Sequence, residues 1–71
     1  MSTNNRTLRR QLDRELTALE DRYLALRDLK SDGALAGQPM ATIIQFDNTV
    51  ESLAAVMQHL RNVIDILGKS E

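Results

Sequence analysis

The sequence predicts an all-α fold, an antiparallel hairpin of two helices, and three observations support that prediction. Each half of the chain carries apolar residues at alternating spacings of three and four, the pattern of a helix that buries one stripe. Glycines and a proline of turn-forming type separate the two halves. The two helices would also have similar lengths, which is typical of antiparallel neighbours joined by a short connection.

The first predicted helix covers residues 5–31 and presents one narrow apolar stripe. The stripe consists of Leu12, Leu16, Leu19, Tyr23 and Leu26. Residues of capping type occupy positions 2–5, at the expected start of the helix. Gly33 follows the helix and can adopt the left-handed backbone conformation that ends many helices, because it has no Cβ. Residues 32–38 are therefore expected to form the connection.

The second predicted helix covers residues 39–67. Pro39 suits its first turn, where the missing N–H group would have no helical partner, and Gly68 is expected to end the helix. An unbroken heptad pattern places at the core positions Ile43, Phe46, Val50, Leu53, Met57, Leu60, Ile64 and Leu67. Val56 and Val63 lie beside this stripe and make it wider than one neighbouring helix can cover.

One segment allows a second interpretation. Residues 41–46 are rich in β-branched side chains, and Asp47, Asn48 or Thr49 could cap a helix that starts later. Residues 41–46 would then form a strand that pairs with its twin from another subunit. The heptad phase favours the continuous helix, because Ile43 and Phe46 are in register with the core positions that follow.

The length of 71 residues predicts one helical-hairpin domain over residues 1–71 that needs additional support. The chain has no cysteine for disulfides, so we expect a homodimer that forms a four-helix bundle. The competing interpretation is a monomeric hairpin that completes its core on a different protein. The expected oligomer interface comprises Ile43, Phe46, Val50, Leu53, Val56, Met57, Leu60, Val63, Ile64 and Leu67.

Charge is distributed unevenly along the chain. Residues 1–30 carry seven basic and five acidic groups, whereas residues 31–71 carry two basic and five acidic groups. This asymmetry favours an antiparallel arrangement of like helices, although screening weakens the effect. The longest apolar run is far shorter than the roughly 18 residues that a membrane span requires, and the N-terminus lacks the apolar segment of a secretory signal. We therefore expect a cytoplasmic protein that does not enter membranes.

The sequence offers no constellation for catalysis. One histidine, His59, would have to serve every role that requires an imidazole, and we interpret it as a residue at the boundary of the apolar stripe. The carboxylates are scattered, and the three glycines lie at turn or stop positions instead of forming a phosphate-binding loop. We therefore expect a protein that is not an enzyme and holds neither cofactor nor metal ion.

Two groups of residues are candidates for contact with a partner. Arg6, Arg10 and Arg14 stack on one helix face with Arg9 beside them, an arrangement that costs helix stability on the order of tenths of a kcal/mol per pair. The group could bind phosphate or an acidic protein surface, or it could be a solvated face. Near the turn, Leu35, Met40 and Ile44 could form an apolar patch that binds a partner, or could cap the core.

The outline resembles several families of short helical hairpins. These are the RNA-binding plasmid copy-number regulators of the Rop type, the small co-chaperones of type III secretion, and phage-encoded inhibitors of host proteins. The shared features are the helix–turn–helix outline and the heptads; Rop-type proteins also carry cysteines, which this chain lacks. No motif ties the chain to one family, so no functional residue is carried over.

From these patterns we expect a small protein-binding module, namely an adaptor, an inhibitor or a chaperone-like hairpin. It would engage itself and an unidentified protein partner through an apolar helix face. The alternative is a small nucleic-acid-binding regulator that uses the N-terminal arginines. The net charge of −1 and the acidic second half favour the protein partner, because both repel a polyanion.

Overall fold

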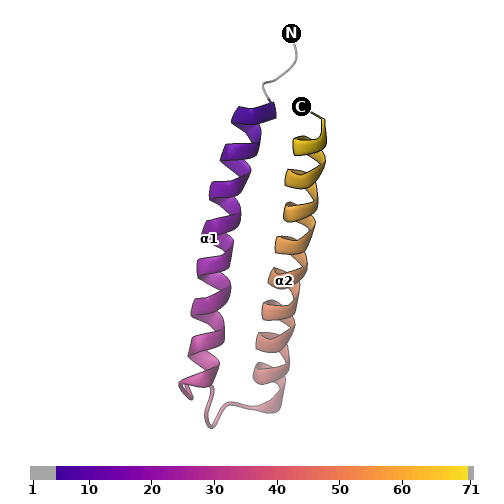
Figure 1. Cartoon of the computed structure of the whole chain (residues 1–71). Coiled ribbons are helices and arrows are strands. Elements are labelled where there is room, and N and C mark those ends of the chain that lie inside the picture. Colours follow the sequence, from indigo (N-terminus) through magenta and orange to yellow (C-terminus); the bar gives the residue numbers. More distant parts are fainter. Residues whose placement is uncertain (1–4, 71) are drawn as a thin grey trace.

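In the computed structural model the chain is an antiparallel hairpin of two long helices, and the structure describes residues 5–70 (Figure 1). Helix α1 spans Asn5–Ser31 and helix α2 spans Met40–Lys69. The start of α1 and the end of α2 lie at the same end of the hairpin (Figure 1). The described residues contain no strand, and residues 41–46 belong to α2. The continuous-helix interpretation is therefore confirmed, and residues 2–4 of the expected cap lie outside the described part.

The connection begins with a capping motif centred on Gly33. Its φ of 83° is left-handed, as predicted, and its N–H group donates to the carbonyl of Lys30 at 3.1 Å. The next N–H group, of Ala34, donates to the carbonyl of Leu29 at 3.0 Å. These two bonds satisfy carbonyls at the end of α1 that have no partner within the helix. The chain therefore leaves α1 abruptly and can reverse over residues 32–39.

Both ends of α2 differ slightly from the prediction. Pro39 lies just before the helix with extended backbone, and its carbonyl accepts the N–H groups of Thr42 and Ile43. At the other end the helix continues through Gly68 to Lys69, so the predicted stop at Gly68 is wrong. The last turn of α2 continues without a left-handed glycine, and the Ser70 N–H group donates to the carbonyls of Ile66 and Leu67.

Gly68 instead allows a close approach between the helices. A Cβ at this position would lie 3.0 Å from a terminal nitrogen of the Arg9 guanidinium. The glycine thus makes room for an α1 side chain against the last turn of α2.

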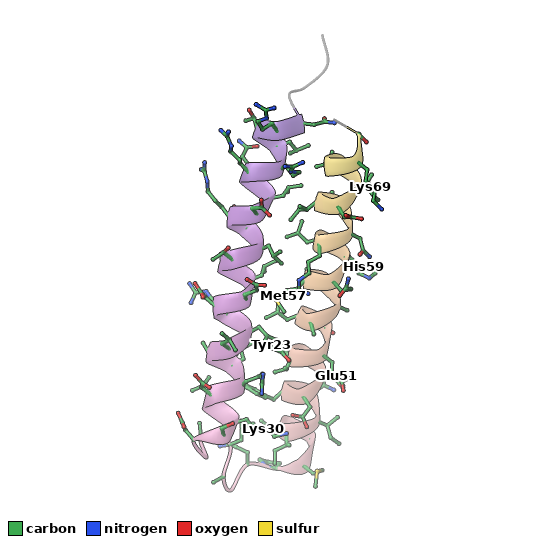
Figure 2. The ribbon with its side chains drawn as sticks, in the orientation of Figure 1. Tyr23, Lys30, Glu51, Met57, His59 and Lys69 are labelled. Carbon is green, nitrogen blue, oxygen red and sulfur yellow. The ribbon has the colours of Figure 1, made fainter. Side chains whose placement is uncertain are left out.

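The core of the hairpin is a single seam between the two helices. Met57, midway along the hairpin, is 5% exposed and is the only buried side chain among the described residues (Figure 2). The other seam residues are half-buried: Leu8, Leu12, Leu16, Leu19, Tyr23, Leu26, Ile43, Phe46, Val50, Leu53, Leu60, Ile64 and Leu67. A helix with one neighbour has one covered side, so these side chains keep an edge in water.

The resulting shape is a rod. Its extents are 56 × 17 × 16 Å and its radius of gyration is 16.3 Å, against about 11 Å for a compact domain of this length. Within the described residues, neither helix combines the length and the apolar character required to cross a membrane.

We predict that Met57→Ala lowers the free energy of unfolding by about 2–5 kcal/mol, because it removes the best-buried side chain and leaves a cavity. The matched control is Leu24→Ala, at a site that is 51% exposed, where we expect a change within about 0.5 kcal/mol. Urea unfolding monitored by helical circular dichroism measures both. Equal effects of the two substitutions would contradict a core centred on Met57.

Candidate interaction surface

Two ion pairs bridge the helices on one side of the seam. Arg61 donates to Glu20 at 3.1 Å, and Lys30 donates to Asp47 at 2.6 Å. Glu20, Arg61 and Asp47 each follow directly after a seam residue, so each is rotated about 100° from the seam in the same sense. We call this the charged side. It carries every aspartate, glutamate, lysine and arginine of α2: Asp47, Glu51, Arg61, Asp65 and Lys69.

The opposite side of the hairpin carries the residues that directly precede seam residues. Val56 directly precedes Met57, Val63 directly precedes Ile64, and on α1 Ala18 directly precedes Leu19. These three residues are therefore rotated about 100° away from the ion pairs. We call this the docking side, and each helix contributes one stripe of exposed residues to it.

The α2 stripe repeats with spacings of three and four over the whole helix. It consists of Thr42, Gln45, Thr49, Ser52, Val56, His59, Val63, Ile66 and Ser70. All nine residues are exposed, and none is an aspartate, glutamate, lysine or arginine. Val56 and Val63 are 49% and 44% exposed. The Thr49 hydroxyl donates to the Gln45 carbonyl of its own helix at 2.9 Å, so its one donor hydrogen is already bonded within α2.

The α1 stripe follows the same spacing. It consists of Gln11, Glu15, Ala18, Arg22, Ala25 and Leu29, all exposed. Its two charged members, Glu15 and Arg22, make no ion pair with any residue that the structure describes. They lie seven residues apart, or about 10 Å along the helix. The docking side thus combines an α2 stripe without aspartate, glutamate, lysine or arginine with an α1 stripe that carries one acid and one base.

The sequence-predicted interface divides into two groups. Met57 is buried, and seven other members are half-buried in the seam; these are Ile43, Phe46, Val50, Leu53, Leu60, Ile64 and Leu67. Only Val56 and Val63 are exposed, with roughly half of each side chain accessible to a partner. The heptad pattern predicted these two valines as contact residues but not the rest of the α2 stripe. The available signal was the absence of charge at nine consecutive positions of this register.

The N-terminal arginines lie at the open end of the hairpin. Arg6, Arg10 and Arg14 are exposed, and Arg9 is half-buried beside Gly68. The structure therefore separates Arg9 from the other three. Neither Arg10 nor Arg14 forms an ion pair with another described residue.

The predicted patch at the turn is also divided. Met40 and Ile44 are exposed one turn apart at the start of α2, whereas Leu35 is half-buried in the connection. The half-burial of Leu35 fits a residue that caps the core end. Met40 and Ile44 lie outside the docking side.

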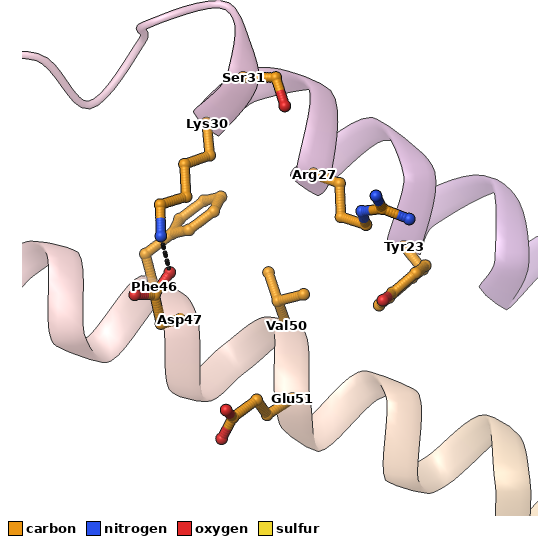
Figure 3. Close-up of a pocket in the computed structure, with 8 residues that line it drawn as sticks. All are labelled: Tyr23, Arg27, Lys30, Ser31, Phe46, Asp47, Val50 and Glu51. Atoms are coloured by element: carbon orange, nitrogen blue, oxygen red, sulfur yellow. Dashed lines mark hydrogen bonds and ion pairs between the residues drawn. The ribbon is translucent and has the colours of Figure 1, made fainter.

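A pocket that the sequence did not predict opens on the charged side near the turn (Figure 3). It has a volume of about 300 Å³, and its walls are Tyr23, Arg27, Lys30, Ser31, Phe46, Asp47, Val50 and Glu51. The Arg27 guanidinium lies over the Tyr23 ring, 5.6 Å from its centre, and the Lys30–Asp47 pair joins the two helices at one edge of the pocket (Figure 3). The two cations and two carboxylates balance, so the pocket has no dominant charge for an ionic ligand.

The described residues contain no group of three or more histidine, cysteine or carboxylate side chains that could hold a metal ion. His59 is exposed on the α2 stripe.

No family model, no curated protein and no solved structure matches the chain.

We predict that the Glu20–Arg61 pair contributes about 0.2–1 kcal/mol to stability, because both side chains are 43% exposed and remain hydrated. A double-mutant cycle with Glu20→Ala and Arg61→Ala measures this coupling energy. We expect it to shrink in 1 M salt, where the screening length falls to about 3 Å. A salt-independent coupling of several kcal/mol would instead indicate a buried pair.

Proposed function

We propose that this chain is a non-catalytic protein-binding module of the cytoplasm, an adaptor, inhibitor or chaperone-like hairpin that binds helices through its docking side. The observation that carries the proposal is the α2 stripe, which exposes nine positions in a row without a charged acid or base. All five such residues of α2 lie instead on the charged side. A long helix with no other role would be expected to spread its charges around its exposed surface.

The stripe also has the geometry for helix packing. Its spacings of three and four place the side chains in one continuous row, which another helix can meet with its own row. Docking there would not strip water from a charged group on α2, which removes a large cost of association. Val56 and Val63 supply the apolar surface in the central and C-terminal parts of the row.

A homodimeric four-helix bundle is the assembly we propose for this surface. A second hairpin on the docking side would contact Val56 and Val63 and cover the half-buried seam residues from a second direction. Met40 and Ile44 would stay outside the bundle and remain available to a different protein.

We predict that Val56→Glu and Val63→Glu each abolish the association of the chain with protein partners. Either substitution forces a carboxylate into the contact, where it has no partner charge. The matched control is Leu24→Glu, since Leu24 is as exposed as Val56 but directly follows the seam residue Tyr23 and so lies on the charged side. Helical circular dichroism verifies that all variants fold, and copurification of the tagged chains from cells measures partner binding.

The expected result is a protein partner retained by the parent chain and by Leu24→Glu, and lost from both valine variants. Binding that survives Val56→Glu and Val63→Glu would show that the docking side is not used.

Nucleic acid is the second candidate partner, because Arg10 and Arg14 are exposed and close together on α1. Asp13 and Asp21 lie on the same helix, and the net charge is −1, so the surface is a poor match for a polyanion.

We predict no sub-micromolar complex with duplex DNA or RNA at physiological salt. Fluorescence anisotropy across a salt series tests this. A tight complex with a log–log salt slope of about −3 to −4, reduced by Arg10→Ala, would reverse the choice of partner.

A further inference from the structure

We infer that a second copy of this chain occupies the docking side in the antiparallel orientation, with a twofold axis that passes close to Ala18 on α1 and between Val56 and Val63 on α2. This inference rests on the proposed function and adds the orientation and the register of the proposed homodimer. In this arrangement α1 lies against the partner's α1, and α2 lies against the partner's α2.

The hairpin exposes more surface than a compact chain of its mass, and the excess is close to the area that each partner buries in a dimer. The chain exposes 5409 Å², whereas a folded monomer of 8.0 kDa is expected to expose about 4,450 Å². The excess of roughly 950 Å² compares with about 800 Å² buried by each partner in an interface of standard size. One further hairpin is therefore enough to bring the surface to an ordinary value.

The charges of the α1 stripe select the antiparallel orientation. Glu15 and Arg22 are three and four residues from Ala18, which is the middle residue of α1. A twofold axis near this midpoint places Glu15 opposite the partner's Arg22 and Arg22 opposite the partner's Glu15. Both charged residues, which have no ion-pair partner among the described residues of their own hairpin, then form reciprocal pairs.

The parallel orientation lacks this match. Its twofold axis would run along the helices and would place α1 against the α2 stripe of the partner. Glu15 and Arg22 would then face a row without aspartate, glutamate, lysine or arginine. Four charged groups per dimer would lose water without gaining an ionic partner, which opposes that assembly.

The α2 stripe brings its two valines close to the same axis. The cross-helix contacts Lys30–Asp47 and Arg9–Gly68 place Ala18 level with about residue 59 of α2, which lies midway between Val56 and Val63. The same twofold axis therefore brings Val56 opposite the partner's Val63, and Val63 opposite the partner's Val56. Two hairpins overlap over the whole length of α1 in this register, and the charged sides remain in water.

Cysteine crosslinking tests the orientation directly, because the chain has no cysteine of its own. In the antiparallel dimer two copies of Ala18→Cys meet at the axis, within the Cα separation of about 4–7 Å that a disulfide requires. The matched control is Ala25→Cys, an exposed alanine of the same stripe. Its two copies would lie 14 residues apart in register, or about 21 Å along the helices.

We expect mild oxidation to give a disulfide-linked dimer of Ala18→Cys and to leave Ala25→Cys unlinked. A mixture of Ala25→Cys with Gln11→Cys should form the linked heterodimer, because these two positions are equally far from the midpoint on opposite sides. Equal self-crosslinking of Ala18→Cys and Ala25→Cys would overturn the antiparallel orientation. The absence of crosslinking in both variants would overturn it as well.

Charge reversal is the second test, read by sedimentation equilibrium of the purified chain. Glu15→Arg and Arg22→Glu should each weaken the dimer by roughly tenfold, since each creates two repulsive contacts in place of two attractive ones. The double variant should return to within about twofold of the parent chain. Failure of the double variant to recover would contradict the reciprocal pairs.

The two proposals fail in distinguishable ways. A parent chain with the mass of one copy at tens of micromolar would overturn the second-copy inference, and the protein-binding function would still stand if copurification remained sensitive to Val56→Glu. A dimer that withstands Val56→Glu and Val63→Glu would overturn both. Dimerisation lost in Val56→Glu, with self-crosslinking of Ala18→Cys and none of Ala25→Cys, is the result that supports both.

Discussion

Each helix of this hairpin has one neighbour, and that limit governs every other property of the molecule. A helix is a cylinder, so one packed neighbour covers only one side of it, and apolar side chains beside the contact stay partly in water. The chain contains enough leucine, isoleucine and valine for a wider core, yet only Met57 becomes buried among the described residues. The rod shape and the large exposed area follow from the same limit. A chain built in this way gains most from the addition of further helices.

The distribution of charge decides where further helices can be added. The ion pairs Glu20–Arg61 and Lys30–Asp47 lie on one side, where they stay hydrated and contribute little to stability. Their presence nevertheless opposes association on that side, because an incoming surface would have to remove the water that hydrates these charges. The opposite side has no such cost along α2. Segregation of charge thus produces a hydrated side and a docking side from two helices of ordinary composition.

The proposed antiparallel pair also accounts for features at the two ends of the hairpin. Each end of the dimer would combine the arginine end of one copy with the turn of the other, so neither end would concentrate the basic charge. Arg10 of one copy and Met40 of its partner would then lie at the same end of the assembly. A partner protein would meet two equivalent composite surfaces, each with an arginine group and an exposed apolar pair.

The sequence by itself determined the elements of this fold. The leucines of α1 and the heptad of α2 specified two helices, since their spacing matches the helical repeat and no other. Gly33 specified the reversal through its left-handed φ, which depends on the absence of a Cβ and not on any distant residue. The register of Ile43 and Phe46 with later core positions was likewise enough to assign residues 41–46 to a helix.

Only the tertiary structure decided which flank of each helix joins the other. A heptad pattern fixes the buried stripe but treats its two flanks alike, and the pairing of Glu20 with Arg61 spans 41 residues of chain. That pairing assigns one flank of each helix to the charged side and so brings Ala18 and Val56 onto the same face. Gly68 shows the same limit, because glycine suits both a helix end and a close approach. The position of the Arg9 side chain, set by the packing of α1 on α2, selects the second role.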